Sequence, residues 1–233
     1  MLRRVGGKPI LWHIMKIYSY YGFNDFIICC GYKGNYIKDY FLNYYMYESD
    51  ITINLKDNTT NVFGKNVEPW NVTLVNTGAE TNTVGRVMKI QKYVENERFM
   101  LTYGDGVSNI NIEELIKFHE KEKRIVTITA AKPAGRWGTI KIGKNNIVED
   151  FMEKDKDNQA WVNAGFAIYE PEIFSYLKDE MQQLEYGPYI KLSEKKQMAA
   201  YKHEGFWYPM DTMRDHDVLE NYWKNGQAPW KIW

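Results

Sequence analysis

The chain has 233 residues, 44% of them hydrophobic, and its 30 basic residues equal its 30 acidic residues. A neutral chain lacks the positive surface that nucleic-acid binding requires, so we expect no nucleic-acid partner. It contains no apolar run of about 18 residues and no apolar signal-peptide core near its start, so we expect neither a membrane partner nor export.

Two neighbouring cysteines, Cys29 and Cys30, lie in a short apolar stretch. Adjacent side chains of a strand point to opposite faces, so a disulfide bond between them would be strained. We therefore expect two reduced thiols, which favours a cytoplasmic location.

Predicted helices and strands alternate along the first 131 residues. Helices are indicated by apolar residues every three or four positions, and strands by short apolar or alternating runs. In chain order we predict a helix over 9–21, a strand over 26–30, a helix over 35–47, strands over 51–55 and 72–76, a helix over 83–94, a strand over 99–103, a helix over 111–121 and a strand over 125–131. This order predicts an α/β fold with a doubly wound, mostly parallel, Rossmann-like sheet.

The pattern changes after Pro133, where strands follow one another with short turns between them. In chain order we predict strands over 138–142, 147–152 and 161–169, a short helix over 171–177, a strand over 198–201 and a helix over 215–224. This half is therefore expected to be partly antiparallel. We find no repeat and no linker, so we expect a single domain over residues 1–233.

The strongest chemical signal is the segment LTYGDG at 101–106, where a predicted strand ends at an Asp flanked by glycines. Ligands of doubly wound sheets bind beyond the carboxyl ends of strands, and glycine lets a phosphate approach the backbone. Asp105 could thus hold Mg²⁺, which prefers one or two carboxylates together with phosphate oxygens. The alternative is an ordinary tight turn.

A second acid, Asp211, lies in the segment GFWYPMDT at 205–212, just before a predicted helix. It could cap that helix, with Thr212 starting the first turn, because Asp is a favoured N-cap residue. It could equally be the second carboxylate of a metal site shared with Asp105.

Several segments resemble one known family. They are GGKPILWHIM at 6–15, DFIICCGYKG at 25–34, EPWNV at 68–72, TYGDGV at 102–107, PMDT at 209–212 and APWKIW at 228–233. They resemble the glucose-1-phosphate cytidylyltransferases, which are sugar-phosphate nucleotidyltransferases. The resemblance implies that CTP and α-D-glucose 1-phosphate react to CDP-glucose and pyrophosphate, for O-antigen-type lipopolysaccharide biosynthesis.

The resemblance also implies roles for individual residues. Asp105 and Asp211 match the Mg²⁺ ligands of the family, and Asp105 and Lys154 its catalytic residues. The nucleotide-binding matches are Thr83, Gly85, Arg86 and Gly104, and the sugar-phosphate-binding matches are Arg136, Gly138, Glu153, Lys154, Asn163 and Gly165. Without the resemblance, Arg86, Lys154 and Asn163 would be read as ordinary solvated or turn residues.

One departure from the family bears on activity. The family places a strand and a Gly-Gly-x-Gly-Thr-Arg loop before the segment that matches residues 1–5. For the chain as written we therefore expect two unpaired strand edges, little turnover, and tighter binding of glucose 1-phosphate or CDP-glucose than of CTP.

Three functions stay open on the sequence: an active cytidylyltransferase, a non-catalytic nucleotide-sugar-binding homologue or assembly module, and a glycosyltransferase that uses Mg²⁺. We also expect a homo-oligomer.

Overall fold

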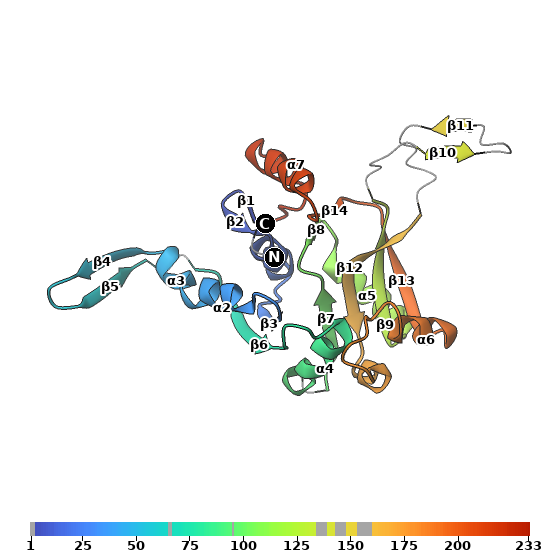
Figure 1. Cartoon of the computed structure of the whole chain (residues 1–233), viewed down its shortest axis with the longest axis horizontal. Coiled ribbons are helices and arrows are strands. Elements are labelled where there is room, and N and C mark those ends of the chain that lie inside the picture. The colour runs from blue at the N-terminus through green and yellow to red at the C-terminus, as the bar shows by residue number, and fades with distance from the viewer. Residues whose placement is uncertain (1–2, 65–66, 95, 134–138, 143–147, 153–159) are drawn as a thin grey trace.

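The computed structural model describes residues 3–64, 67–94, 96–133, 139–142, 148–152 and 160–233 (Figure 1). The elements of the first half are, in chain order, β1 (Arg4–Val5), β2 (Lys8–Pro9), α1 (Ile10–Tyr20), β3 (Asp25–Cys30), α2 (Gly34–Leu42), α3 (Tyr44–Tyr47), β4 (Asp50–Asn54), β5 (Thr59–Phe63), β6 (Asn71–Asn76), α4 (Thr83–Val94), β7 (Phe99–Thr102), β8 (Gly106–Ser108) and α5 (Ile112–Glu122).

The second half contains more strands than helices. Its elements are β9 (Val126–Ala131), β10 (Thr139–Ile142), β11 (Val148–Met152), β12 (Val162–Tyr169), the 3-10 helix η2 (Pro171–Tyr176), α6 (Pro188–Glu194), β13 (Met198–His203), β14 (Trp207–Pro209) and α7 (Met213–Lys224). The predicted change to a partly antiparallel second half is confirmed, because β12 is antiparallel to both of its neighbours.

The central sheet consists of two parts. Strands β3 and β6 pair in parallel, and a four-stranded part has the order β13-β9-β12-β7, in which β13 and β9 are parallel. The two parts lie on either side of the molecule's centre (Figure 1), and no described strand pairs with both β3 and β7. The predicted α/β fold with parallel strand pairs is confirmed, and the sheet is interrupted between β3 and β7.

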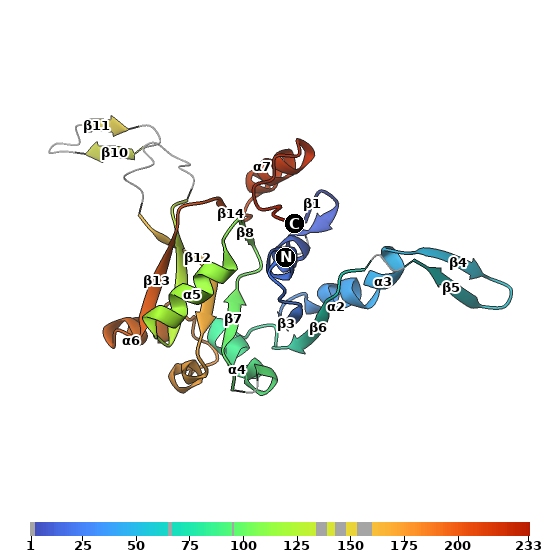
Figure 2. The same ribbon diagram turned by 180° about the vertical axis from the view of Figure 1, so that it is seen from behind.

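Helices cover both parts of the sheet. Seen from behind, α5 crosses the four-stranded part (Figure 2) and contacts β9 and β13. Asn111 caps α5 by accepting a hydrogen bond from the backbone N–H of Glu114 at 3.1 Å. Helix α1 buries Ile10, Ile14 and Ile17 in the largest apolar cluster of the described residues.

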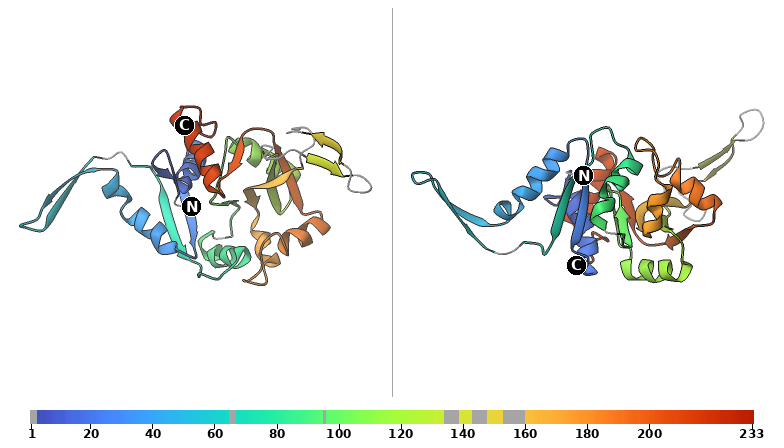
Figure 3. Two further views of the ribbon diagram at one scale, coloured as in Figure 1. Left: turned by 45° about the horizontal axis from the view of Figure 1, so that its top comes forward. Right: turned by 90° about the horizontal axis from the view of Figure 1, so that it is seen from below.

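A long hairpin of β4 and β5 extends away from the rest of the chain (Figure 3). The strand predicted at 51–55 is present, but it pairs with β5 in this arm. The helix predicted over 35–47 is divided at Asn43, which ends α2 and precedes α3. An isolated two-stranded hairpin gains little stability in water, so the arm has little stability of its own.

His13 on α1 joins the two ends of the chain. Its Nε2 lies 2.9 Å from the Val5 carbonyl oxygen, and the Trp230 indole N–H lies 3.3 Å from its Nδ1. Because an indole N–H only donates, Nδ1 accepts from Trp230 and Nε2–H donates to Val5. Burial lowers the pKa of His13 to about 4, although the Val5 carbonyl opposes this shift, so the ring is neutral at pH 7.

No helix in the described ranges is long and apolar enough to cross a bilayer.

Candidate active site

Asp105 lies in the turn between β7 and β8, as its place after an apolar strand predicted. Gly104 and Gly106 are buried on either side of it, and the Asp105 side chain reaches solvent. Strand β8 pairs with β14 so that Gly106 lies opposite Pro209, and the backbone N–H of Met210 donates to the Asp105 carbonyl at 2.7 Å. This pairing brings Asp211 beside Asp105, although the two are far apart in sequence.

The two carboxylates influence each other. Asp105 reaches solvent, but neighbouring atoms partly desolvate its carboxyl group. This partial burial raises the pKa of Asp105 from its usual 3.8, and the negative charge of Asp211 raises it further. The charge of Asp211 therefore disfavours the charged state of Asp105, and a cation placed between the two carboxylates would relieve that repulsion.

Asp211 does not cap the following helix, which corrects one of the two interpretations offered by the sequence. The N-cap of α7 is Thr212, whose hydroxyl accepts from the Asp215 N–H at 3.2 Å while its own N–H donates to the Asp215 carboxylate at 2.9 Å. Asp211 contributes only its backbone N–H to this capping box, at 3.2 Å from Asp215. Its carboxylate is not used by the cap, so it is available to a ligand.

The stretch from Asn163 to Gly165 lies against the same turn. The register between β12 and β9 shifts between Asn163 and Ala167, and the Asn163 amide oxygen accepts from the Gly165 N–H at 3.0 Å. Gly165 has a φ of +76°, and a β-carbon on it would lie 3.0 Å from the Tyr103 ring. Only glycine fits both this φ angle and the contact with Tyr103. The bulge therefore lies against the residue that precedes Gly104.

The predicted nucleotide-binding residues Thr83, Gly85 and Arg86 begin α4. The Thr83 hydroxyl accepts from the Leu184 N–H at 2.9 Å, and a β-carbon on Gly85 would lie 2.7 Å from the Glu180 carbonyl oxygen. Both residues thus have structural reasons for their identity.

Arg86 is not an ordinary surface residue of its helix. Its guanidinium donates to the Thr77 hydroxyl at 3.0 Å and packs against Gly31, just beyond the carboxyl end of β3. It lies on the wall of the same cleft as Gly104 and Asp105.

Four predicted sugar-phosphate residues, Arg136, Gly138, Glu153 and Lys154, lie outside the described residues. Their roles stay predictions.

A cleft of about 1700 Å³ runs along β3 and β7 and includes the carboxyl ends of both strands. Glu185 lines it and accepts a hydrogen bond from the Tyr103 hydroxyl. Burial raises the pKa of Tyr103, and the neighbouring Tyr189 and Glu185 add to this effect, so Tyr103 keeps its proton. The sequence analysis did not single out Tyr103 or Glu185 as site residues, because nothing local links positions 82 residues apart.

The donor set at the turn fits a hard divalent cation. Two carboxylates from different strand ends are what Mg²⁺ uses when phosphate oxygens and water fill its remaining positions. No group of three or more His, Cys, Asp or Glu side chains in the described ranges forms a fuller metal cage. A metal held by Asp105 and Asp211 would therefore depend on a phosphate ligand.

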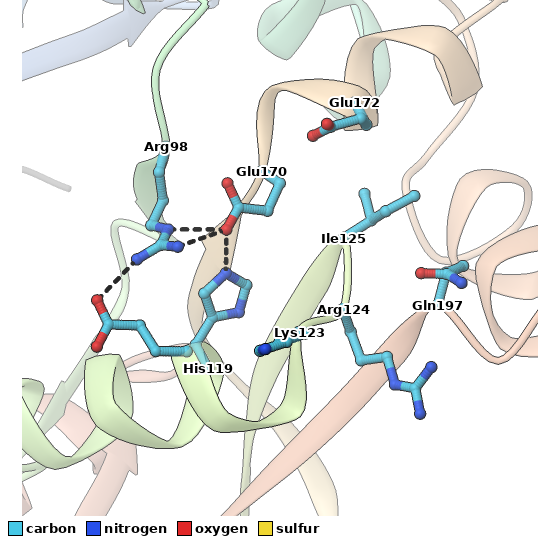
Figure 4. A pocket seen from close by; sticks show the side chains of 9 residues that line it. Arg98, His119, Lys123, Arg124, Ile125, Glu170, Glu172 and Gln197 are labelled. Carbon is cyan, nitrogen blue, oxygen red and sulfur yellow. Dashed lines mark hydrogen bonds and ion pairs between the residues drawn. The ribbon is translucent and has the colours of Figure 1, made fainter.

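A second, smaller cavity of about 280 Å³ lies at the opposite end of β7 (Figure 4). Four of the side chains that line it, Arg98, His119, Glu120 and Glu170, form a network of ion pairs. Arg98 contacts Glu170 at 2.7 Å and Glu120 at 3.1 Å, and the buried His119 lies 3.1 Å from Glu170. These contacts link β7, β12 and α5. We therefore interpret the network as one that stabilises the fold rather than as a ligand site.

The Rossmann-like fold, with a carboxylate pair and an arginine at the carboxyl ends of its strands, is that of a nucleotide-handling α/β protein. The nucleotidyl transferase family matches residues 1–224, and the chain belongs to this family.

Two curated relatives match almost the whole chain. The glucose-1-phosphate cytidylyltransferases of Salmonella typhimurium and Salmonella typhi are each 46% identical over 230 residues, which cover 98% of this chain and 89% of the relative. The resemblance to cytidylyltransferases that the sequence segments carry is thereby confirmed.

The solved structures support the fold. HddC from Yersinia pseudotuberculosis complexed with GMP-PN has a TM-score of 0.67 and 17% sequence identity, and the match covers 95% of this chain and 88% of that one. This similarity carries the fold alone, because the identity is low.

Proposed function

We propose that this chain is a glucose-1-phosphate cytidylyltransferase, which transfers the cytidylyl group of CTP to glucose 1-phosphate and releases pyrophosphate. The observation that carries the proposal is the 46% identity to two such enzymes over 98% of the chain. The cleft with two adjacent carboxylates supports it, because transfer between phosphates needs compensation of negative charge.

The residues of the chain would divide this work. Asp105 and Asp211 would hold Mg²⁺, which neutralises phosphate charge when it is bound. Arg86 lies on the cleft wall, where its guanidinium would contact the nucleotide phosphates. Asn163 and Gly165 form the bulge beside Tyr103, where the sugar phosphate would bind, together with Glu153 and Lys154.

The test uses the chain with Mg²⁺, glucose 1-phosphate and each of CTP, UTP, dTTP and ATP, and measures nucleotide sugar and pyrophosphate. We expect CDP-glucose as the main product. Faster formation of another nucleotide sugar would overturn the choice of cytidine. Tight binding of CDP-glucose with no product from any nucleotide would favour the non-catalytic nucleotide-sugar-binding homologue instead.

We also propose a homo-oligomer, supported by the arm of β4 and β5. Ile51 lies opposite Val62 and Ile53 opposite Thr60, so these residues share one face of the hairpin. That face is exposed, with Ile53 54% accessible. Sedimentation of the chain and of Ile53→Lys would test it. We expect the variant to dissociate, and a monomeric parent chain would contradict the proposal.

A further inference from the structure

Arg86 and Lys89 are neighbouring cations on one face of α4, and both donate hydrogen bonds to Thr77. The Arg86 guanidinium donates to the Thr77 hydroxyl at 3.0 Å, and the Lys89 ammonium donates to the Thr77 carbonyl oxygen at 3.1 Å. Residues three positions apart lie side by side on a helix, so one turn of α4 holds both the hydroxyl and the carbonyl of this threonine. Thr77 is therefore the residue at which α4 is attached to the end of β6.

The backbone holds Thr77 in place independently of α4. Thr77 directly follows β6, and its N–H donates to the Cys30 carbonyl oxygen at 2.9 Å, which continues the parallel ladder between β3 and β6 by one residue. Thr77 is also fully buried. Its hydroxyl is therefore a fixed acceptor for a long side chain that would otherwise sample many rotamers.

The two cations differ in what compensates their charge. Lys89 lies 2.8 Å from the Glu180 carboxylate and also donates to the Thr81 hydroxyl at 3.3 Å, so its charge is compensated within the protein. Among the described residues, no carboxylate forms an ion pair with Arg86. The Thr77 hydroxyl is a neutral acceptor, so it orients the guanidinium without cancelling its charge. The charge of Arg86 is thus left for an anionic ligand.

Arg86 reaches the cleft because Gly31 leaves room for its guanidinium. A β-carbon on Gly31 would lie 1.9 Å from a guanidinium nitrogen of Arg86, so only a residue without a side chain fits there. Arg86, Gly31 and Asp105 line the same cleft, and the described lining of this cleft does not include the buried Thr77. Thr77 therefore lies behind Arg86 and does not touch a ligand in the cleft.

We propose that Thr77 is a positioning residue, whose hydroxyl holds the Arg86 guanidinium where it contacts the phosphates of the nucleotide. The identity of that ligand rests on the proposed function. The entropy cost of fixing a long side chain is then met on folding rather than on binding, which strengthens binding. Lys89 has a different part, because its compensated charge holds the Thr77 carbonyl and residues 77–81 in place.

The experiment compares variants of the intact chain that differ in one hydroxyl. Thr77→Val removes the hydroxyl and keeps the branched shape, while Thr77→Ser keeps the hydroxyl. Thr81→Val is the matched control, because the Thr81 hydroxyl accepts from the charge-compensated Lys89 instead of Arg86. Arg86→Gln, alone and combined with Thr77→Val, shows whether the threonine acts through the arginine.

The first readout is the affinity for CDP-glucose with Mg²⁺, measured by calorimetry. We expect Thr77→Val to weaken binding about tenfold, because the charged donor loses its acceptor, and Thr77→Ser and Thr81→Val to stay within about twofold of the parent. Adding Thr77→Val to Arg86→Gln should change the affinity no further. Unchanged affinity in Thr77→Val, an equal loss in Thr81→Val, or a second loss of about tenfold in the double variant would overturn the proposal.

The second readout needs no nucleotide, so it separates this inference from the proposed function. Nitrogen NMR of the guanidinium in the ligand-free chain reports how fast the Arg86 side chain rotates about its Nε–Cζ bond. We expect slow rotation, with separate signals of the two Nη groups, in the parent and in Thr77→Ser, and averaged signals in Thr77→Val.

Averaged signals in the parent chain would overturn the proposal even if no variant folds, because the hydroxyl would then not hold the guanidinium. Slow rotation in the parent without binding of CDP-glucose would support the position of Arg86 and contradict the proposed function.

Discussion

The two ends of strand β7 handle charge in opposite ways. At its amino end, Arg98 and Glu170 are paired with each other and with their neighbours, so the charges stabilise the fold. At its carboxyl end, burial and then the negative charge of Asp211 raise the pKa of Asp105, so two like charges lie side by side. A fold keeps like charges adjacent at a cost in stability, and a ligand that neutralises them recovers that cost. The charges at the amino end of β7 therefore stabilise the fold, whereas those at its carboxyl end are suited to binding a ligand.

The largest effect is expected from Asp105→Asn. It should lower CDP-glucose formation by a factor on the order of a hundred and weaken Mn²⁺ binding at least about tenfold, because one of two carboxylate ligands is lost. The melting temperature should stay equal or rise slightly, since repulsion with Asp211 disappears. Asp39→Asn, an exposed change on α2, is the control. Unchanged Mn²⁺ affinity in Asp105→Asn would show that Asp105 does not bind the metal.

Glu170→Ala should lower the melting temperature and leave metal binding unchanged, the reverse of Asp105→Asn. The side chain of His119 is 1% exposed, and its Nε2–H donates to Glu170, while its Nδ1 accepts from Thr127 at 2.7 Å. Leaving a buried donor unpaired costs about 1–3 kcal/mol, which lowers the melting temperature by several degrees in a chain of this size.

The control for that variant is Glu172→Ala at the same cavity, where the exposed side chain should matter little. Mn²⁺ affinity should be normal in both. A Glu170→Ala protein as stable as the parent would show that the ion pairs at the amino end of β7 do not stabilise the fold.

Gly165→Ala tests how tightly the backbone packs at the binding end. The φ of +76° and the contact with Tyr103 should together destabilise the fold by about 1–3 kcal/mol. Gly226 also has a positive φ, of +67°, but open space around it, so Gly226→Ala measures the backbone strain alone. The excess loss in Gly165→Ala reports the clash with Tyr103, and equal losses would mean that Tyr103 moves freely.

The smallest effect is a difference in titration, which carboxyl-carbon NMR can measure. The pKa of Asp105 should lie above 3.8, and that of Glu170 below 4.5. For Glu170, burial raises the pKa, but hydrogen bonds from Arg98 and His119 outweigh burial. Glu170 therefore stabilises the fold above its unfolded pKa and loses this contribution as pH falls through its folded pKa. Asp105 has a raised folded pKa, so its contribution to stability is present below its unfolded pKa and is lost as pH rises through its folded pKa.

Mg²⁺ sharpens this last comparison. A cation on Asp105 and Asp211 favours their charged forms, so it should lower the pKa of Asp105 and leave that of Glu170 unchanged. A Mg²⁺-induced shift of both groups would point to a general salt effect rather than a site.

Local sequence predicted the elements that have strong periodicity. The helix expected over 83–94 has the bounds of α4, because its apolar residues recur at helical spacing. Strands β8 and β14 have three residues each, show no period, and exist because residues 106–108 pair with 207–209. Such pairing is set by tertiary structure, which single-residue preferences do not contain.

The candidate site was predictable to a similar extent. A glycine-flanked Asp after an apolar strand placed Asp105 at a strand end without further information. Asp211 was ambiguous, since sequence could not decide whether it or Thr212 caps α7. Asn163 and Arg86 came only from the family resemblance, because a strand amide and a helix arginine have no local pattern that marks a ligand.

The hydrogen bond that the neutral His13 ring accepts has a consequence for folding during synthesis. The ring accepts from Trp230, 217 positions away, and Trp230 is fully buried against the apolar face of α1. A ribosome adds roughly 5–20 residues per second, so the part of this face that Trp230 covers stays open for on the order of ten seconds or longer before Trp230 emerges. During synthesis this apolar part of α1 is therefore exposed to solvent. A chaperone that covers it should matter most just before residue 230 emerges from the ribosome.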